Sequence, residues 1–145
     1  CASCHQEAAA SMRGVGARYP VFAPELGRLV NVEQRINQCR REHMGAAPWA
    51  TESEPLLAMT AYVKHQSLDL PVNPAIDGPA APFFARGRHI YHTRRGQLDL
   101  ACIHCHEMNH GNMLRAQRLS EGMSNGFPAY RLKWQTLASM QRRME

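Results

Sequence analysis

The sequence has few aromatic residues and no long apolar run, and each absence excludes a class of protein. Phe, Trp and Tyr make up 7% of the 145 residues, and no stretch interleaves basic and aromatic side chains as a base-stacking surface does. No 18 consecutive apolar residues occur, so no segment can cross a bilayer as a helix. We therefore expect no nucleic acid partner and no membrane span.

A targeting segment and a strong charge imbalance are also missing. The chain begins at Cys1, without the charged and apolar regions of a signal peptide, so we expect any targeting segment to have been removed or to lie outside this sequence. Lys and Arg number 17 against 12 Asp and Glu, a formal charge of +5. This modest excess suits acidic protein faces or small anions.

Cysteine is scarce, but its placement is informative. Five cysteines are too few for a disulfide scaffold, and four of them lie in two C-x-x-C-H motifs, Cys1–His5 and Cys102–His106. This is the attachment sequence of c-type haem, in which both thiols form thioethers and the histidine binds the iron. The motifs predict two covalently bound haem c groups, with thioethers at Cys1, Cys4, Cys102 and Cys105 and iron ligands at His5 and His106.

A single C-x-x-C-H motif has two alternative interpretations, a zinc half-site and a thioredoxin-like redox pair. Zinc bound by the four motif cysteines would leave both following histidines unexplained. Because haem is attached outside the bacterial cytoplasm, the two motifs also predict a periplasmic location.

Helical patterns dominate the rest of the chain. Asn31 and Gln34 are spaced as a capping box that begins a helix, and Gly45 ends it. A second helix is predicted from Ser53, with Pro55 in its first turn. Further helices are predicted for residues 83–95, ended by Gly96, and for residues 128–144; no segment is expected to form a strand.

A proline-rich segment divides the chain. Residues 71–82 contain four prolines and one glycine, and cannot continue a helix. The prediction is an all-α protein of two tandem cytochrome c-like domains, residues 1–70 and 83–145, joined by the linker 71–82. The first domain has no helix before its motif, so we expect its N-terminal part to be missing here, and the C-terminal part of the second domain likewise.

Cys39 is the one cysteine outside the motifs, and it lies on the apolar face of the helix predicted after Asn31. In an oxidising compartment such a cysteine is a buried thiol, an intermolecular bridge or a metal ligand. We favour thiolate ligation of the first iron, which would lower the potential of that haem.

A weak internal repeat suggests a counterpart to Cys39. Residues 19–22 resemble residues 127–130, and each segment is followed by apolar periodicity and a Gln-Arg pair. If Arg143 corresponds to Arg35, the second cysteine falls two residues beyond Glu145. We expect that cysteine to be the distal ligand of the second haem.

Taken together, the residues resemble the SoxA family, the dihaem subunits of the SoxAX cytochromes of sulfur-oxidising bacteria. The resemblance covers essentially the whole chain and is carried by residues 1–5, 26–40, 44–49, 57–63, 94–102, 126–135 and 141–143. It implies a first haem held by a motif histidine and a cysteine at the position of Cys39. It also implies a second haem held by His106 and a catalytic cysteine persulfide, with a substrate-binding arginine at the position of Arg143.

The same resemblance implies an L-cysteine S-thiosulfotransferase, which joins thiosulfate oxidatively to a cysteine of the carrier SoxYZ and passes electrons through haem. The implied partner is a SoxX-like monohaem cytochrome. Arg142 and Arg143 would supply positive charge for the substrate, whereas we expect Arg131 and Lys133 to be solvated. A dihaem thiosulfate dehydrogenase, a plain electron carrier and a non-catalytic interaction subunit are the alternatives.

Overall fold

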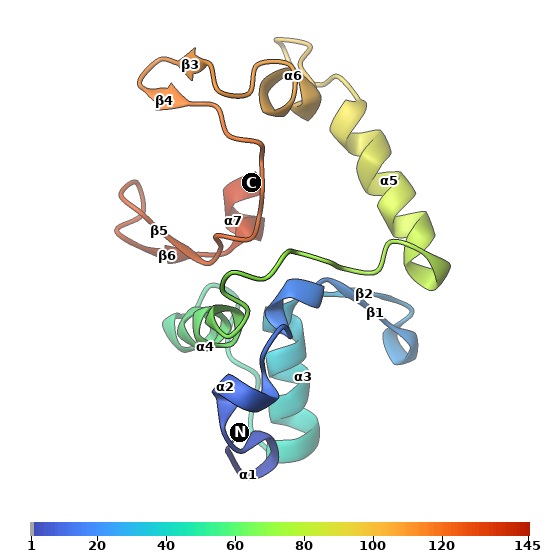
Figure 1. Ribbon diagram of the computed structural model, residues 1–145, viewed down its shortest axis with the longest axis vertical. Coiled ribbons are helices and arrows are strands. Elements are labelled where there is room, and N and C mark those ends of the chain that lie inside the picture. Colours follow the sequence, from blue (N-terminus) through green and yellow to red (C-terminus); the bar gives the residue numbers. More distant parts are fainter. Residues whose placement is uncertain (1) are drawn as a thin grey trace. The chain divides into compact units, whose positions relative to one another are not determined.

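The computed structural model describes residues 2–145, which form two compact units. Of the described residues, the first unit comprises 2–75 and 125–145, and the second comprises 76–124. The helices of the first unit are α1 (Ala2–His5), α2 (Ala8–Ser11), α3 (Val32–Met44), α4 (Glu54–His65) and α7 (Met140–Met144), and its strands are β1 (Val21–Ala23), β2 (Arg28–Val30), β5 (Ala129–Arg131) and β6 (Thr136–Ala138) (Figure 1).

The second unit has fewer regular elements. They are α5 (Ala81–His92), α6 (Cys102–His106), β3 (Met113–Leu114) and β4 (Gln117–Arg118). Single 3₁₀ turns complete the two units: Gly16–Arg18 and Pro24–Leu26 in the first, and Gly78–Ala80 in the second.

The two longest helices of the first unit begin where the sequence predicted. The Asn31 side chain accepts from the Gln34 N–H at 2.8 Å, the Gln34 side chain accepts from the Asn31 N–H at 3.0 Å, and Gly45 ends α3 at φ 59°. Helix α4 follows Ser53 with a proline in its first turn. Both predictions are confirmed.

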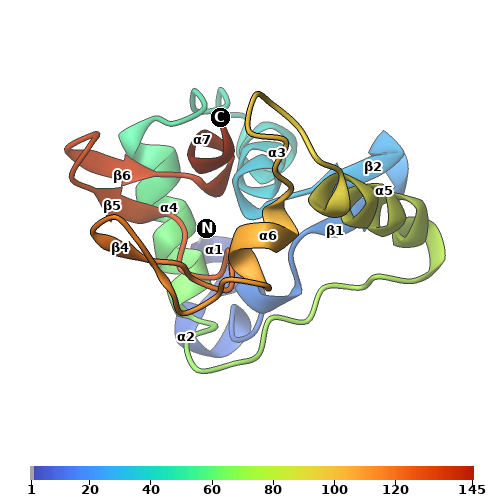
Figure 2. The same ribbon diagram turned by 90° about the horizontal axis from the view of Figure 1, so that it is seen from above.

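Helices α3 and α4 pack together, and β6 lies against α4 (Figures 1 and 2). The contact buries the core of the first unit. Its largest fully buried side chains are Leu57, Val30 and Thr60, at 1%, 2% and 0% exposure. Gly16 approaches α4 so closely that a Cβ there would lie 2.9 Å from the Lys64 Cα.

The segment that follows α3 has no regular secondary structure, but side chains of α3 hold it in place. The Asn37 side chain donates to the Trp49 carbonyl at 2.9 Å and accepts from the Trp49 N–H at 2.8 Å. The Arg40 guanidinium donates to the Ala47 carbonyl and lies 3.8 Å from the centre of the Trp49 ring. The side chains of α3 therefore replace the hydrogen bonds that a strand or helix would give this segment.

The expectation that no strands occur was wrong, since six short strands within residues 2–145 pair into three antiparallel hairpins. The strands have two or three residues each, too few for an alternating pattern to emerge from the sequence.

The prediction of a helix for residues 128–144 was also wrong over most of that range. Tyr130 and Leu137 are at helical spacing, but they face each other across the β5–β6 hairpin. Helix α7 occupies only the last five residues of that range. Packing of β6 on α4, which leaves Ala138 0% exposed, outweighs local helical preference.

The hairpin and α7 group with the first unit, although the predicted boundaries assign them to the second domain. Glu52 accepts from the Ser139 N–H at 3.2 Å, and the Lys64 ammonium donates to the Phe127 carbonyl. Burial lowers the pKa of that ammonium. The predicted domains, 1–70 and 83–145, and the predicted linker, 71–82, stay predictions. The compact units differ from these domains mainly at residues 125–145, which group with the first unit.

Candidate functional site

The second C-x-x-C-H motif forms α6, a five-residue helix. Helical spacing brings Cys102 into line with Cys105 and His106, three and four residues later. Neither cysteine forms a disulfide, and Cys102 is exposed. The Ala101 N–H donates to the His104 Nδ1 at 2.9 Å, so the His104 side chain caps the start of the helix. Both thiols are thus free for covalent attachment on one short turn.

His106 is held in an orientation that suits an iron ligand. Its Nδ1 lies 2.8 Å from the Ser120 carbonyl oxygen, so Nδ1 carries the proton and donates it to that oxygen. Nε2 then has a free lone pair, the arrangement that metal-binding histidines adopt. Gly122 lies against the same ring, because a Cβ at this position would be 3.1 Å from its Cγ and Nδ1.

Sequence reasoning missed this support for His106. The acceptor is a main-chain carbonyl, which any residue at position 120 can supply, so no side-chain pattern reveals it. The only trace is Gly122, whose φ of +75° is a conformation that favours glycine.

The surroundings of α6 fit a large apolar group. Among the described residues of the second unit, only Ala80 and Ala101 are buried hydrophobic residues, and α5 buries none. The exposed apolar side chains of this unit include Phe83, Phe84, Ile90, Leu98, Leu100, Met108, Met113, Leu114 and Met123. A porphyrin attached to α6 offers such side chains apolar surface to cover, and the donor set of two thiols and one oriented imidazole is the one that haem c requires.

The first motif lies on α1, which ends at His5. Cys4 is exposed and His5 is half-buried, while Cys1 lies outside the described residues. The Ser11 hydroxyl donates to the His5 carbonyl and also to the Glu7 carbonyl at 3.0 Å, which ties the end of α1 to α2. The motif is therefore part of a fixed helical turn.

Cys39 lies in the second half of α3 as a free, half-buried thiol. Its neighbour Gln38 is only 5% exposed and donates one hydrogen bond to Glu25 in the β1–β2 turn. Within residues 2–145, no hydrogen bond connects Cys39 to His5, and no three His, Cys, Asp or Glu side chains converge as a site for a bare metal ion. The ligand roles of His5, Cys39 and His106 stay predictions.

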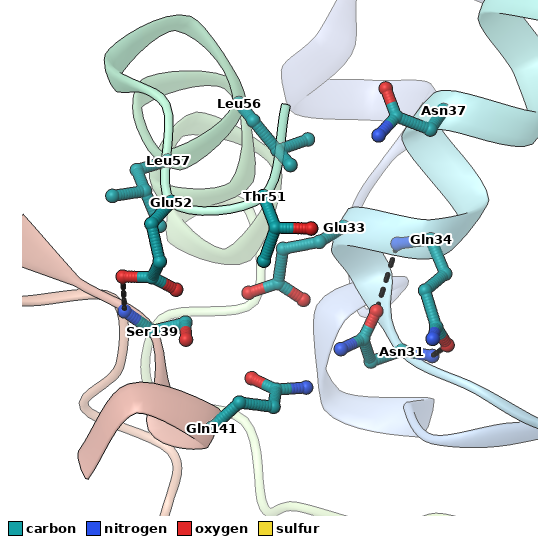
Figure 3. A pocket seen from close by; sticks show the side chains of 10 residues that line it. All are labelled: Asn31, Glu33, Gln34, Asn37, Thr51, Glu52, Leu56, Leu57, Ser139 and Gln141. Carbon is teal, nitrogen blue, oxygen red and sulfur yellow. Dashed lines mark hydrogen bonds between the residues drawn. The ribbon is translucent and has the colours of Figure 1, made fainter. Parts of the chain in front are cut away.

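A polar pocket of about 130 Å³ lies between α3, the start of α4 and the Ser139 turn (Figure 3). Both Asn31, the N-cap of α3, and Ser139, the N-cap of α7, line it. Figure 3 shows the carboxylates of Glu33 and Glu52 directed into the same space. No Lys or Arg is among its lining residues, so the pocket repels anions.

The basic residues noted near the C-terminus differ in their surroundings. The Arg142 guanidinium lies 4.7 Å from the centre of the Trp134 ring, a cation–π contact. Arg143 and Lys133 are exposed, and Arg131 is half-buried. The substrate-binding role predicted for Arg143 is untested by these positions.

Comparison with known proteins gives a family for this arrangement. Residues 1–72 match the model of the SoxA/TsdA cytochrome c domain. The chain is 44% identical over 144 residues to the L-cysteine S-thiosulfotransferase subunit SoxA of Pseudaminobacter salicylatoxidans, covering 99% of this chain and 50% of that protein. It is 45% identical over 143 residues to the subunit of the same name from Paracoccus pantotrophus, covering 99% and 49%.

The structural comparison agrees with the sequence comparison. The crystal structure of SoxXA from P. pantotrophus matches with a TM-score of 0.87 at 45% identity, covering 99% of this chain and 54% of that chain. This chain therefore spans about half the length of the relatives it matches. None of the described helices is both long enough and apolar enough to traverse a bilayer.

The cytochrome c fold predicted from the motifs is thus confirmed for residues 1–72, the range that the domain model matches. A cytochrome c domain carries covalently bound haem c.

Proposed function

Because its identity to SoxA subunits over nearly the whole chain makes this protein a member of the SoxA family, we propose that it is a dihaem L-cysteine S-thiosulfotransferase subunit. That identity is the observation that carries the proposal. The reaction joins thiosulfate to a cysteine of a SoxYZ carrier. Two tandem cytochrome c-like domains would each hold one haem c.

The reaction forms one sulfur–sulfur bond and breaks one S–H bond. The carrier thiol and the outer sulfur of thiosulfate combine to a thiosulfonate, and one proton and two electrons leave. Haem c, when bound, supplies the one-electron acceptor chemistry that this oxidation needs.

The residues of this chain have holding and orienting roles in the proposal. Cys1, Cys4, Cys102 and Cys105 form the thioethers, and His5 and His106 are the proximal ligands. The Ser120 carbonyl keeps the proton of His106 on Nδ1. Cys39 is the distal ligand of the first haem, and a cysteine beyond Glu145 is that of the second.

Arg143 is the residue we assign to the substrate. A guanidinium can bind two oxygens of a sulfonate group at once, and Arg143 is exposed on α7. The acidic pocket of Figure 3 is unsuitable for the same ligand, because Glu33 and Glu52 would repel a dianion.

The proposed partners are a SoxX-like monohaem cytochrome and the SoxYZ carrier, and the proposed location is the periplasm. The matched crystal structure is that of SoxXA, an assembly that supports the first partner. Covalent haem attachment supports the location.

The matched family model covers TsdA as well as SoxA, which keeps a dihaem thiosulfate dehydrogenase as the second candidate. Such an enzyme would join two thiosulfates to tetrathionate and would need no carrier thiol. A plain electron-transfer subunit would consume no thiosulfate at all.

The test uses the full-length protein with its cytochrome partner. Thiosulfate consumption is measured with SoxYZ, with SoxYZ whose cysteine is blocked, and without carrier, and the carrier is examined by mass spectrometry. Thiosulfonate on the carrier, formed only when its thiol is free, supports the proposal. Tetrathionate without carrier would establish the dehydrogenase, and no consumption would refute both enzymes.

The ligand assignment has its own measurement. Electron paramagnetic resonance of the oxidised protein should show a low-spin thiolate-ligated haem that disappears in Cys39→Met. A control variant, Ser67→Ala in the turn after α4, should leave that signal unchanged. An unaltered spectrum in Cys39→Met would refute Cys39 as ligand.

A further inference from the structure

The first unit contains the same structural module twice. Strands β1 and β2 pair Val21 with Val30, and strands β5 and β6 pair Ala129 with Ala138. Each hairpin follows a cis-proline peptide bond and leads directly into a helix, α3 or α7. Both modules are visible in Figure 1.

The two turns also share a hydrogen bond. In the first turn the Gly27 N–H donates to the Pro24 carbonyl at 3.2 Å, and in the second the Gln135 N–H donates to the Leu132 carbonyl at 3.4 Å and to the Arg131 carbonyl at 2.9 Å. Gly27 and Gln135 both have positive φ, 61° and 53°. The two turns therefore follow the same path.

The helix starts correspond as well. The Asn31 side chain accepts from the N–H of Gln34, and the Ser139 hydroxyl accepts from the N–H of Arg142. One turn into each helix, the N–H groups of Arg35 and Arg143 donate to the carbonyls of the two capping residues, at 3.0 and 3.3 Å. Arg143 thus stands where Arg35 stands in the first module.

In the first module the arginine has a carboxylate partner. Arg35 donates from Nη1 to the Gln38 Oε1 at 2.8 Å, and the same nitrogen lies 3.9 Å from a carboxylate oxygen of Glu25. Gln38 donates in turn to Glu25 at 2.9 Å. The hydrogen bond from Gln38 is the main cause that lowers the pKa of Glu25. The guanidinium of Arg35 therefore already has partners within the protein.

In the second module a cation replaces that carboxylate. The register that pairs Val21 with Val30 and Ala129 with Ala138 places Lys133 at the position of Glu25. Within residues 2–145, no carboxylate lies within ion-pair distance of Lys133 or Arg143. The neighbouring Arg142 lies over the Trp134 ring. Two exposed positive charges thus stand where the first module has an ion pair.

We propose that Lys133 determines the anion specificity of the second module: it leaves Arg143 unpaired and, together with Arg143, binds a small divalent sulfur oxyanion. The inference rests on the proposed function for the identity of that anion. The contact between Glu25 and Arg35 demonstrates that a side chain in this turn reaches the helix arginine. A single anion between Lys133 and Arg143 is accordingly within reach of both.

The chemistry of the two cations is complementary. The guanidinium of Arg143 offers paired donors to two oxygens of one sulfonate group, and the ammonium of Lys133 is a compact charge that binds a third oxygen or a terminal sulfur. The two like charges repel each other while the site is free, and a dianion relieves that repulsion. Dianions should therefore bind better than monoanions.

The experiment uses the full-length haem-loaded protein with its cytochrome partner. Lys133→Glu restores the charge of the first module, Lys133→Arg keeps the cation, and Arg28→Glu is the matched control, an exposed charge reversal in the corresponding hairpin of the first module. Thiosulfate turnover gives kcat and KM, and calorimetry gives equilibrium binding of thiosulfate and of sulfate. Thermal unfolding establishes that each variant folds.

We expect Lys133→Glu to weaken thiosulfate and sulfate binding at least about tenfold, with KM raised by a similar factor and kcat changed less. Lys133→Arg should retain most of the affinity, and Arg28→Glu should change neither quantity. In the Lys133→Glu background, Arg143→Ala should cost much less affinity than it costs in the parent protein, because the new carboxylate already occupies the guanidinium.

Two outcomes would overturn the proposal: parental affinity for both anions in Lys133→Glu, or equal losses in Lys133→Glu and Arg28→Glu. The proposed function fails differently. If the parent protein forms no thiosulfonate but its sulfate binding depends on Lys133, the anion site stands and the transferase assignment falls.

Discussion

The two compact units differ in what holds them together. The first has a side-chain core between α3, α4 and β6, in which Leu57 is 1% exposed. The second, over its described residues, buries only two apolar side chains, both alanines, and its one long helix, α5, buries no residue. A unit with so little buried apolar surface gains little hydrophobic free energy from its own chain. We infer that the second unit depends on its proposed haem for stability and that the first does not.

The largest effect should follow removal of the second attachment site. In the variant Cys102→Ala/Cys105→Ala, residues 76–124 should lose ordered structure, because these residues bury only two apolar side chains of their own. Limited proteolysis of the full-length protein should cleave this range at a rate raised by orders of magnitude.

The parallel variant Cys1→Ala/Cys4→Ala sharpens the comparison. It should leave α3 and α4 resistant to the same protease, since buried side chains such as Leu57 already fill the contact between them. Equal protease sensitivity of both units in the two variants would contradict the difference we infer.

A core truncation in the first unit should have the next largest effect. Leu57→Ala should lower the free energy of unfolding by about 2–5 kcal/mol, the range for a buried leucine in a close-packed core. Leu68→Ala, in the turn after α4, is the control, because that side chain is 62% exposed and such changes stay within about 0.5 kcal/mol. Denaturant unfolding measures both, and similar losses would show that the first unit has no independent core.

A third variant tests the turn that supports His106. Gly122→Ala should destabilise by about 1 kcal/mol, since φ is +75°, and should also displace the imidazole that a Cβ would approach to 3.1 Å. We expect a shifted haem absorption spectrum as well as lower stability. Gly96→Ala is the matched control, with φ +70° and open space around its Cβ. It should lower stability without a spectral change. Identical spectra for the two variants would show that Gly122 does not affect the position of the His106 imidazole.

The smallest effect concerns Glu25. Its pKa is lowered in the folded state, so its contribution to stability is present above the unfolded value near 4.5 and is lost as the pH falls through the lower folded value. Glu25→Gln should therefore make stability less sensitive to pH below about 4.5 than it is in the parent protein. Denaturant midpoints between pH 6 and about pH 3 measure this, with Glu42→Gln on the exposed side of α3 as control. A parental slope in Glu25→Gln would exclude the carboxylate from the network.

The fold was predictable from the sequence where the signal is local. The capping box at Asn31, the glycine stop at Gly45 and the proline after Ser53 each act within one helical turn, and α3 and α4 begin as they indicate. Tyr130 and Leu137 misled because helical spacing and hairpin pairing can place the same two residues on one face. Long-range packing against α4 decides between them.

The candidate site, too, was predictable from the sequence only where the signal is local. The thiols and histidines of both motifs are fixed by spacing alone, and the structure places Cys102–His106 on one helix. The Ser120 carbonyl that orients His106 was not predictable, because a main-chain acceptor has no side-chain signature. The internal repeat, with the same offset at residues 19–22 and at Arg35, also aligns Glu25 with Lys133, and the strand register agrees. The contact of Glu25 with Arg35 was not predictable, because it depends on how the turn folds toward the helix.

The two hydrogen bonds between Asn37 and Trp49 affect which substitutions this surface segment tolerates. One side-chain amide contacts both the N–H and the carbonyl of Trp49, and main-chain groups are the same in every amino acid. Substitutions at residues 46–48 should therefore be tolerated without change in the path of the segment, provided that Asn37 is kept. Exchange of Asn37 for aspartate, which lacks the donor, should remove the hydrogen bond to the Trp49 carbonyl and loosen the end of the segment, which Arg40 still holds at Ala47.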